Sequence, residues 1–171
     1  MHDSAIIGGE DPTLEKAKQK AFRLLSVRGR STKEIRLKLK ERGFAEPVVE
    51  KVIVRLLELN YLDDKSFAEQ WARNLAVNRL YGNRRIEMSL LEKGIGRNLI
   101  ELSIALVREE RSEKEAINIL IKKKFKGRKV SELDEKEKRR LAQNLMGRGF
   151  PAGLIFEALG RTEEEFINDG K

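Results

Sequence analysis

Three short segments of this chain end in the same pattern, and that repetition constrains the fold more than any other feature of the sequence. The segments are KLKERGF (38–44), SLLEKGI (89–95) and NLMGRGF (144–150). Their glycines are 51 and 55 residues apart and stand at Gly43, Gly94 and Gly149. A period of this length is typical of chains built from tandem structural units.

Apolar residues recur at fixed distances from each glycine. Eight and four positions before it stand Ile35 and Leu39, Ile86 and Leu90, and Leu141 and Leu145. This step predicts a helix that ends at the glycine, which can adopt the left-handed conformation that follows a helix. Five and six positions after it stand Val48 and Val49, Leu99 and Ile100, and Leu154 and Ile155. These pairs predict a second helix, and the residue directly after each glycine (Phe44, Ile95 or Phe150) would fix the corner between the two helices.

Another helix is predicted before each of these pairs. The first covers about 13–28, the second begins at the acids Asp63 and Asp64, and the third follows the capping box SEKE (112–115). A similar box, STKE (31–34), opens the second helix of the first unit, and TEEE (162–165) predicts a short helix near the end of the chain. Asp63 and Asp64 lack a third ligand nearby, so we interpret them as helix caps and not as metal ligands.

The sequence therefore predicts an all-α fold of three tandem three-helix repeats, about nine helices in an elongated, curved array. The expected parts are a disordered tail over 1–12, repeats over 13–62, 63–110 and 111–160, and a short tail helix over 161–171.

Charge is distributed unevenly over these parts. The net charge is +8, but residues 13–62 hold 13 bases against 6 acids, residues 63–110 hold 8 against 8, and residues 111–160 hold 13 against 7. Two basic repeats thus flank a neutral one, a pattern that suits a long anionic partner touched at separate places. Lysine-rich, solvated helix faces would give the same numbers, so charge alone leaves both interpretations open.

The sequence lacks the residues and motifs of several common enzyme classes. The chain has no cysteine, and its one histidine is His2. There is no Walker A loop, and the fingerprint-like start Gly94-Ile95-Gly96 fails because Leu99 stands where a third glycine is needed. We expect no catalytic residue, cofactor or metal.

No apolar run reaches the roughly 18 residues of a membrane span, and the N-terminus lacks signal-peptide features, so we expect a cytoplasmic protein with no membrane partner.

The strongest contact candidates are the bases ten positions before each glycine, namely Lys33, Arg84 and Arg139. Each is predicted near the first turn of its helix, where a cation is unfavourable by about 0.3–1 kcal/mol. Because an unfavourable positive charge recurs in all three repeats, we infer that it has a function. Binding of an anion beside the helix N-terminus would be such a function. A salt bridge to a neighbouring acid, or chance, is the alternative.

Further candidates adjoin these bases or form a separate cluster. Arg36 and Lys40 share a helix face with Lys33, and the exposed Leu37 expected there would suit a protein partner. Arg85 follows Arg84, and the nearby Tyr81 would either stack on a base or pack at a corner. The third repeat offers a cluster of phosphate-contact candidates, for which a solvated helix end is the alternative: Lys122, Lys123, Lys124, Lys126, Arg128 and Lys129.

Two other sets of residues are interpreted as structural. The base directly before each glycine (Arg42, Lys93 or Arg148) lies at a predicted helix C-terminus, where the helix dipole stabilises a cation. Trp71 stands four residues from both Phe67 and Leu75 in an apolar stripe, so we expect it in the core.

Three long segments resemble a known family. YLDDKSFAEQWARNL (61–75) and YGNRRIEMSLLEKGI (81–95) are similar to the central repeat of RecX regulatory proteins, and AFRLLSVRGRSTKEIRLKLKERGF (21–44) is similar to their first repeat. The resemblance covers roughly 14–160. It implies a monomeric, non-enzymatic protein of DNA repair and recombination, without a cofactor. Such a protein lies in the groove of a RecA–single-stranded DNA filament and restrains the recombinase's ATP hydrolysis and strand exchange.

Two hypotheses on the partner follow. The resemblance implies a filament regulator with some direct affinity for single-stranded DNA, and double-stranded DNA as a further candidate ligand. The alternative is an autonomous DNA-binding protein that uses helix-turn-helix-like repeats to read a groove. The neutral central repeat favours the filament regulator, because a stand-alone DNA reader would gain from bases throughout its length.

Overall fold

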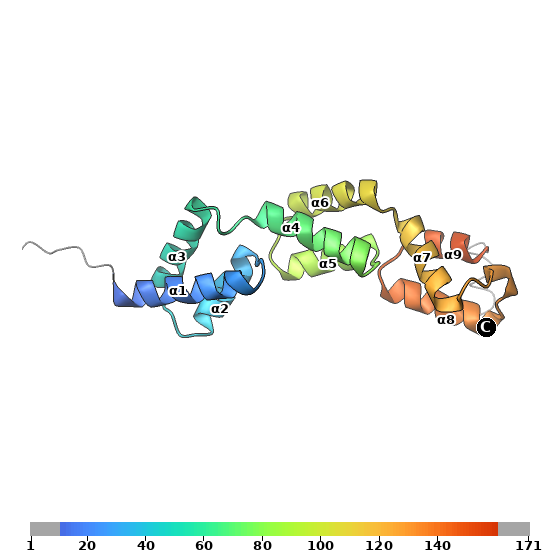
Figure 1. The fold of residues 1–171 in the computed structure, drawn as a ribbon, viewed down its shortest axis with the longest axis horizontal. Coiled ribbons are helices and arrows are strands. Elements are labelled where there is room, and N and C mark those ends of the chain that lie inside the picture. Colours follow the sequence, from blue (N-terminus) through green and yellow to red (C-terminus); the bar gives the residue numbers. More distant parts are fainter. Residues whose placement is uncertain (1–10, 161–171) are drawn as a thin grey trace, which may run out of the picture. The chain divides into compact units, whose positions relative to one another are not determined.

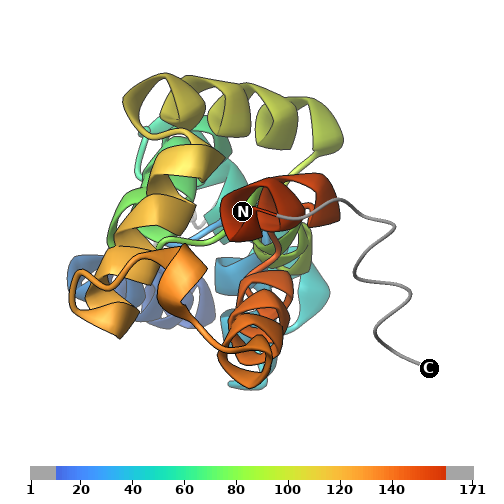
Figure 2. The same ribbon diagram turned by 90° about the vertical axis from the view of Figure 1, so that its right-hand side faces the viewer.

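A computed structural model describes residues 11–160 of the chain, and in this range it contains nine α-helices and no strand (Figure 1). Repeat 1 comprises α1 (Pro12–Val27), α2 (Thr32–Lys40) and α3 (Glu46–Glu58). Repeat 2 comprises α4 (Asp64–Arg73), which continues as the π-helical turn η1 (Asn74–Asn78), then α5 (Asn83–Glu92) and α6 (Arg97–Glu110). Repeat 3 comprises α7 (Glu113–Phe125), the 3-10 turn η2 (Val130–Glu132), α8 (Glu135–Gly147) and α9 (Ala152–Leu159) (Figure 2). The predicted all-α fold of three tandem three-helix repeats is confirmed.

The predicted tails lie almost entirely outside the described residues, 11–160. Helix α1 already includes Pro12, and Asp11 caps it by accepting a hydrogen bond from the Thr13 N–H. The chain divides into two compact units, and the boundary follows Phe67 within α4. None of the helices in residues 11–160 is long and apolar enough to cross a membrane.

The three glycine corners have the same backbone geometry. Gly43, Gly94 and Gly149 have φ angles of 85°, 78° and 86°. At each corner the residue after the glycine donates its N–H to the carbonyl five residues earlier, from Phe44 to Leu39 (3.3 Å), Ile95 to Leu90 (3.1 Å) and Phe150 to Leu145 (3.2 Å). These bonds, with one from each glycine N–H to the carbonyl three residues earlier, make the Schellman motif. The predicted equivalence of the corners is confirmed.

Each repeat buries the stripe predicted before its glycine. Ile35, Leu39, Ile86, Leu90 and Leu145 are fully buried, and Leu141 is 1% exposed. In repeat 1 the stripe packs with Ala17 and Ala21 of α1, whose small side chains let the helices approach closely. The core of repeat 3 also receives Leu80 from repeat 2, which adopts a left-handed backbone conformation (φ 53°).

Capping residues fix the helix starts, largely as the sequence predicts. The capping boxes at Ser31 and Ser112 are both formed, and Asp63 caps α4 through the N–H groups of Lys65 and Ser66. A further box, missed in the sequence, joins Asp134 to Glu137 and starts α8 at Glu135. Helix α8 therefore includes residues 135–137.

Candidate partner-binding surface

The bases ten positions before the glycines do not occupy equivalent places in their helices. Lys33 and Arg84 are the second residues of α2 and α5, and both side chains are exposed. Arg139 is the fifth residue of α8, because the cap at Asp134 starts that helix earlier. Lys33 and Arg84 thus lie within the first turn and Arg139 directly after it, with its side chain exposed as well.

Internal carboxylates occupy the starts of α2 and α5. Asp64 accepts a hydrogen bond from the Thr32 N–H at 2.8 Å, and Glu113 accepts one from the Asn83 N–H at 2.8 Å. Each acid is the first residue of the next repeat's first helix. Each acid therefore lies at the start of the helix that carries Lys33 or Arg84, and its hydrogen bond makes that backbone N–H group unavailable to an external anion.

The predicted basic stripe of α2 is partly neutralised by α3. The Arg36 guanidinium makes two hydrogen bonds to the Glu50 carboxylate, at 2.7 and 2.9 Å, which raise the pKa of Arg36 and lower that of Glu50. Lys40 forms an ion pair with Glu46. Both side chains thus tie α2 to α3. Leu37 is 47% exposed on α2, as predicted.

Tyr81 packs at a corner. The guanidinium carbons of Arg85 and Arg148 lie 5.8 and 5.7 Å from the centre of its ring. Arg148 also donates to the carbonyl of Arg79 at 2.9 Å, which agrees with the structural role expected for it. The two guanidinium groups surround Tyr81, so the corner interpretation explains this residue better than base stacking does.

The same corner brings repeats 2 and 3 into backbone contact. The Gly82 N–H donates to the carbonyl of Arg148 at 2.9 Å, and a Cβ on Gly82 would lie 2.3 Å from the carbonyl oxygen of Gly149. Arg108, not predicted from the sequence, fixes the start of α5 within repeat 2 by donating to the Asn83 side chain (2.7 Å) and the Tyr81 carbonyl (2.9 Å). Burial lowers the pKa of Arg108, and Glu113 opposes that shift.

The basic cluster of repeat 3 is exposed around the end of α7. Of its six members, Arg128 is held by two hydrogen bonds to Glu137, at 3.0 and 3.2 Å. The other five are exposed and follow one another through the C-terminus of α7 and the next turn: Lys122, Lys123, Lys124, Lys126 and Lys129. Lys126 ends α7 in a left-handed conformation, which turns the chain sharply within this cluster.

Repeat 2 exposes an apolar and acidic face that the sequence interpretation missed. Leu102 and Leu106 of α6 are 65% and 53% exposed. Leu106 lines a groove of about 550 Å³ between α4 and α6, together with Glu69, Glu109 and other residues of these helices. The spacing of four residues between Leu102 and Leu106 can be read from the sequence. Only the packing of α6 determines that these two side chains are exposed to solvent.

No group of three or more potential metal ligands gathers within residues 11–160. Among the exposed features of that range are basic surfaces in repeats 1 and 3 and an apolar, acidic face in repeat 2.

Comparison with known proteins agrees with the resemblance found in the sequence. Three family models match in order, those of the first, second and third three-helix domains of RecX, over residues 17–56, 63–103 and 112–159. The chain is 31% identical over 166 residues to the regulatory protein RecX of Mycobacterium sp. (strain JLS), covering 92% of this chain and 90% of that protein. It is 33% identical over 151 residues to the regulatory protein RecX of Prosthecochloris aestuarii, covering 87% and 95%.

Solved structures give the same result. A crystal structure of regulatory protein RecX matches with a TM-score of 0.71 and 26% identity, over 86% of this chain and 71% of that one. RecX from Lactobacillus salivarius shares the fold with a TM-score of 0.72, over 86% of this chain and 95% of that one. Because three consecutive domain models and near full-length relatives match, the chain belongs to the RecX family of regulatory proteins.

Proposed function

We propose that this chain is a non-enzymatic regulator that binds the filament of a RecA-type recombinase on single-stranded DNA and restrains ATP hydrolysis and strand exchange. The observation that carries the proposal is that the chain exposes an apolar, acidic groove between α4 and α6 in repeat 2 as well as basic surfaces in repeats 1 and 3. A partner made of both protein and nucleic acid fits this combination of surfaces.

The face of repeat 2 suits a protein partner. Leu102 and Leu106 are exposed, and burying them against another protein would stabilise the complex by about 25 cal/mol per Å² of apolar area. Glu109 and Glu101 are exposed on the same helix and would repel a phosphate backbone. This combination argues against the alternative of an autonomous DNA reader, in which the helix after each corner would contact DNA.

The basic surface of repeat 3 suits nucleic acid. Five exposed lysines between 122 and 129 stand close together in the chain, and lysine is an effective phosphate contact without base specificity. A regulator that must bind filaments on any sequence needs contacts of this kind.

A retention assay on immobilised single-stranded DNA tests the proposal. We expect the chain to be retained in the presence of a RecA-type recombinase and ATP at a salt concentration that releases it from DNA alone. The recombinase's DNA-dependent ATPase rate should fall as the chain is added. Equal retention with and without recombinase would support the autonomous DNA-binding alternative instead.

Two substitutions test the surface assigned to the protein partner. Leu102→Asp with Leu106→Asp should abolish retention by the filament while leaving the thermal melt nearly unchanged, because both side chains are exposed. The matched control is Val54→Asp with Leu57→Asp on α3, whose side chains are 52% and 43% exposed. If both pairs reduce retention equally, the face of repeat 2 has no special role.

A further inference from the structure

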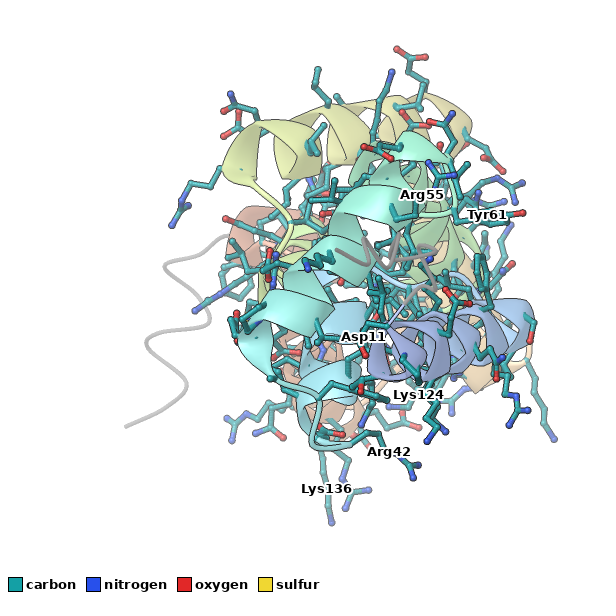
Figure 3. The ribbon with its side chains drawn as sticks, turned by 90° about the vertical axis from the view of Figure 1, so that its left-hand side faces the viewer. Asp11, Arg42, Arg55, Tyr61, Lys124 and Lys136 are labelled. Atoms are coloured by element: carbon teal, nitrogen blue, oxygen red, sulfur yellow. The ribbon has the colours of Figure 1, made fainter. Side chains whose placement is uncertain are left out.

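Repeat 1 contains a cationic groove between α1 and its glycine corner. The groove has a volume of about 280 Å³ and is lined by Lys16, Gln19, Lys20, Arg23, Arg42 and Phe44. Three of the four cations follow one another on one face of α1 at steps of four and three residues, and the fourth comes from the corner. Figure 3 shows Arg42 projecting outward from that corner. No carboxylate lines the groove.

Several other cations of repeat 1 have acidic partners, and the four cations of the groove have none among the described residues. Arg36 and Lys40 pair with acids of α3, and Arg28 pairs with Glu34. Within residues 11–160, no ion pair or side-chain hydrogen bond engages Lys16, Lys20, Arg23 or Arg42. Like charges gathered in a concave site without counter-charges create a positive potential that attracts an anion.

Repeat 2 fills the equivalent groove with its own side chains. The buried pair Ala17 and Ala21 of α1 corresponds to Ala68 and Ala72 of α4, which are 51 residues further along and also fully buried. The same offset places Trp71 at the position of Lys20. The Trp71 N–H donates to the Ser89 hydroxyl at 2.9 Å, so the indole is fixed over α5.

The corner base also has a different environment in each repeat. Lys93, which corresponds to Arg42, places its ammonium 4.4 Å from the centre of the Trp71 ring. In repeat 3, Arg148 is engaged by the Arg79 carbonyl and the Tyr81 ring. Arg42 has no such contact in its own repeat. Lys93 and Arg148 therefore have structural contacts in addition to the helix dipole expected for all three corner bases, whereas Arg42 has only its place at the end of α2.

We propose that this groove of repeat 1 binds the phosphate backbone of single-stranded nucleic acid. From Lys16 to Arg23 the stripe covers about 10 Å of helix at 1.5 Å per residue, which suits a chain of phosphates better than a single ion. The half-buried Phe44 adds an aromatic ring beside the cations, and a ring favours a ligand with bases over an acidic polypeptide. The inference rests on the proposed function and deepens it by assigning a nucleic-acid site in repeat 1 besides the basic surface of repeat 3, and its test needs no recombinase.

Binding of a fluorescein-labelled oligothymidylate to the full chain, followed by anisotropy at several salt concentrations, tests the assignment. The variant Lys20→Gln with Arg23→Gln removes two groove charges and keeps side chains that favour helix. We expect its affinity to fall about tenfold or more. The slope of log K against log salt should become shallower by about 1.4, since each single-strand phosphate contact contributes roughly 0.7.

The control is Lys51→Gln with Lys65→Gln, which removes two exposed cations of the same unit outside the groove. Its affinity and salt slope should stay near those of the parent. Equal losses in both variants, no loss in the groove variant, or no binding by the parent at low salt would overturn the proposal. Equally tight binding of polyglutamate in the groove would overturn the choice of nucleic acid. Filament inhibition is measured separately, so its failure in the parent would remove only the proposed function.

Discussion

Glu113, the first residue of α7, accepts a hydrogen bond from the backbone N–H of Asn83, the first residue of α5, at 2.8 Å. The same relationship joins Asp64, the first residue of α4, to Thr32, the first residue of α2, also at 2.8 Å. In both cases the leading acid of one repeat caps the second helix of the repeat before it. Successive repeats are therefore linked by a helix cap supplied from a distant part of the chain.

We expect Glu113→Ala to destabilise the chain by about 0.5–2 kcal/mol, the usual cost of losing a side-chain cap. Urea unfolding measures this change. Glu109→Ala, which removes an exposed acid from the preceding helix, serves as the control and should change stability by less than about 0.5 kcal/mol. Equal effects would mean that Glu113 acts only through net charge.

Gly82 should tolerate no side chain, whereas Gly96 should. Both residues are N-caps with extended backbones (φ −75° and −70°), but a Cβ on Gly82 would meet the backbone of Gly149 at 2.3 Å and a Cβ on Gly96 would meet nothing within 4 Å. We expect Gly82→Ala to cost more than about 2 kcal/mol, since backbone must move, and Gly96→Ala less than about 1 kcal/mol. Thermal melts of the two variants should separate clearly, and coincident melts would contradict the close approach.

Leu90→Ala should cost about 2–5 kcal/mol, because Leu90 is fully buried and its replacement leaves a cavity in the core of repeat 2. Chemical denaturation gives the number. Leu91→Ala is the neighbouring control, since Leu91 is 37% exposed and should cost less. A melt of Leu90→Ala that matches the parent would show that the helix register is wrong.

Acid should weaken the link between α8 and the loop before it. Hydrogen bonds from the Arg128 guanidinium, and then from the Asp134 N–H, lower the pKa of Glu137 below its ordinary value. A carboxyl whose pKa is lower in the folded state stabilises the fold above its unfolded pKa and loses that contribution as the pH falls through the folded value. We therefore expect Glu137→Gln to melt earlier than the parent near pH 7, and the difference to shrink and then disappear as the pH falls through the lowered pKa of Glu137. A difference that persists in acid would mean that packing, and not the charge of Glu137, is responsible.

Much of the fold follows from short-range rules. The left-handed glycines at 43, 94 and 149, the apolar four-residue step before each and the boxes at Ser31 and Ser112 each act within one or two helical turns. Because such interactions depend only on nearby residues, the sequence alone predicts three helical repeats, their corners and the buried leucines. The RecX resemblance rests on the same local patterns.

The candidate surface depended on contacts that local patterns do not record. Lys20 and Trp71 occupy equivalent positions, yet one lines an open groove and the other covers its own repeat, because Ser89 and Lys93 lie within reach of the indole. Arg36 was predicted to face a partner, and its charge is instead satisfied by Glu50, 14 residues away in the chain. Whether two charged side chains pair depends on the distance between them when they lie on different helices. The sequence by itself therefore determined the repeats and the total of basic residues, whereas the tertiary structure decided which of those bases remain available to a partner.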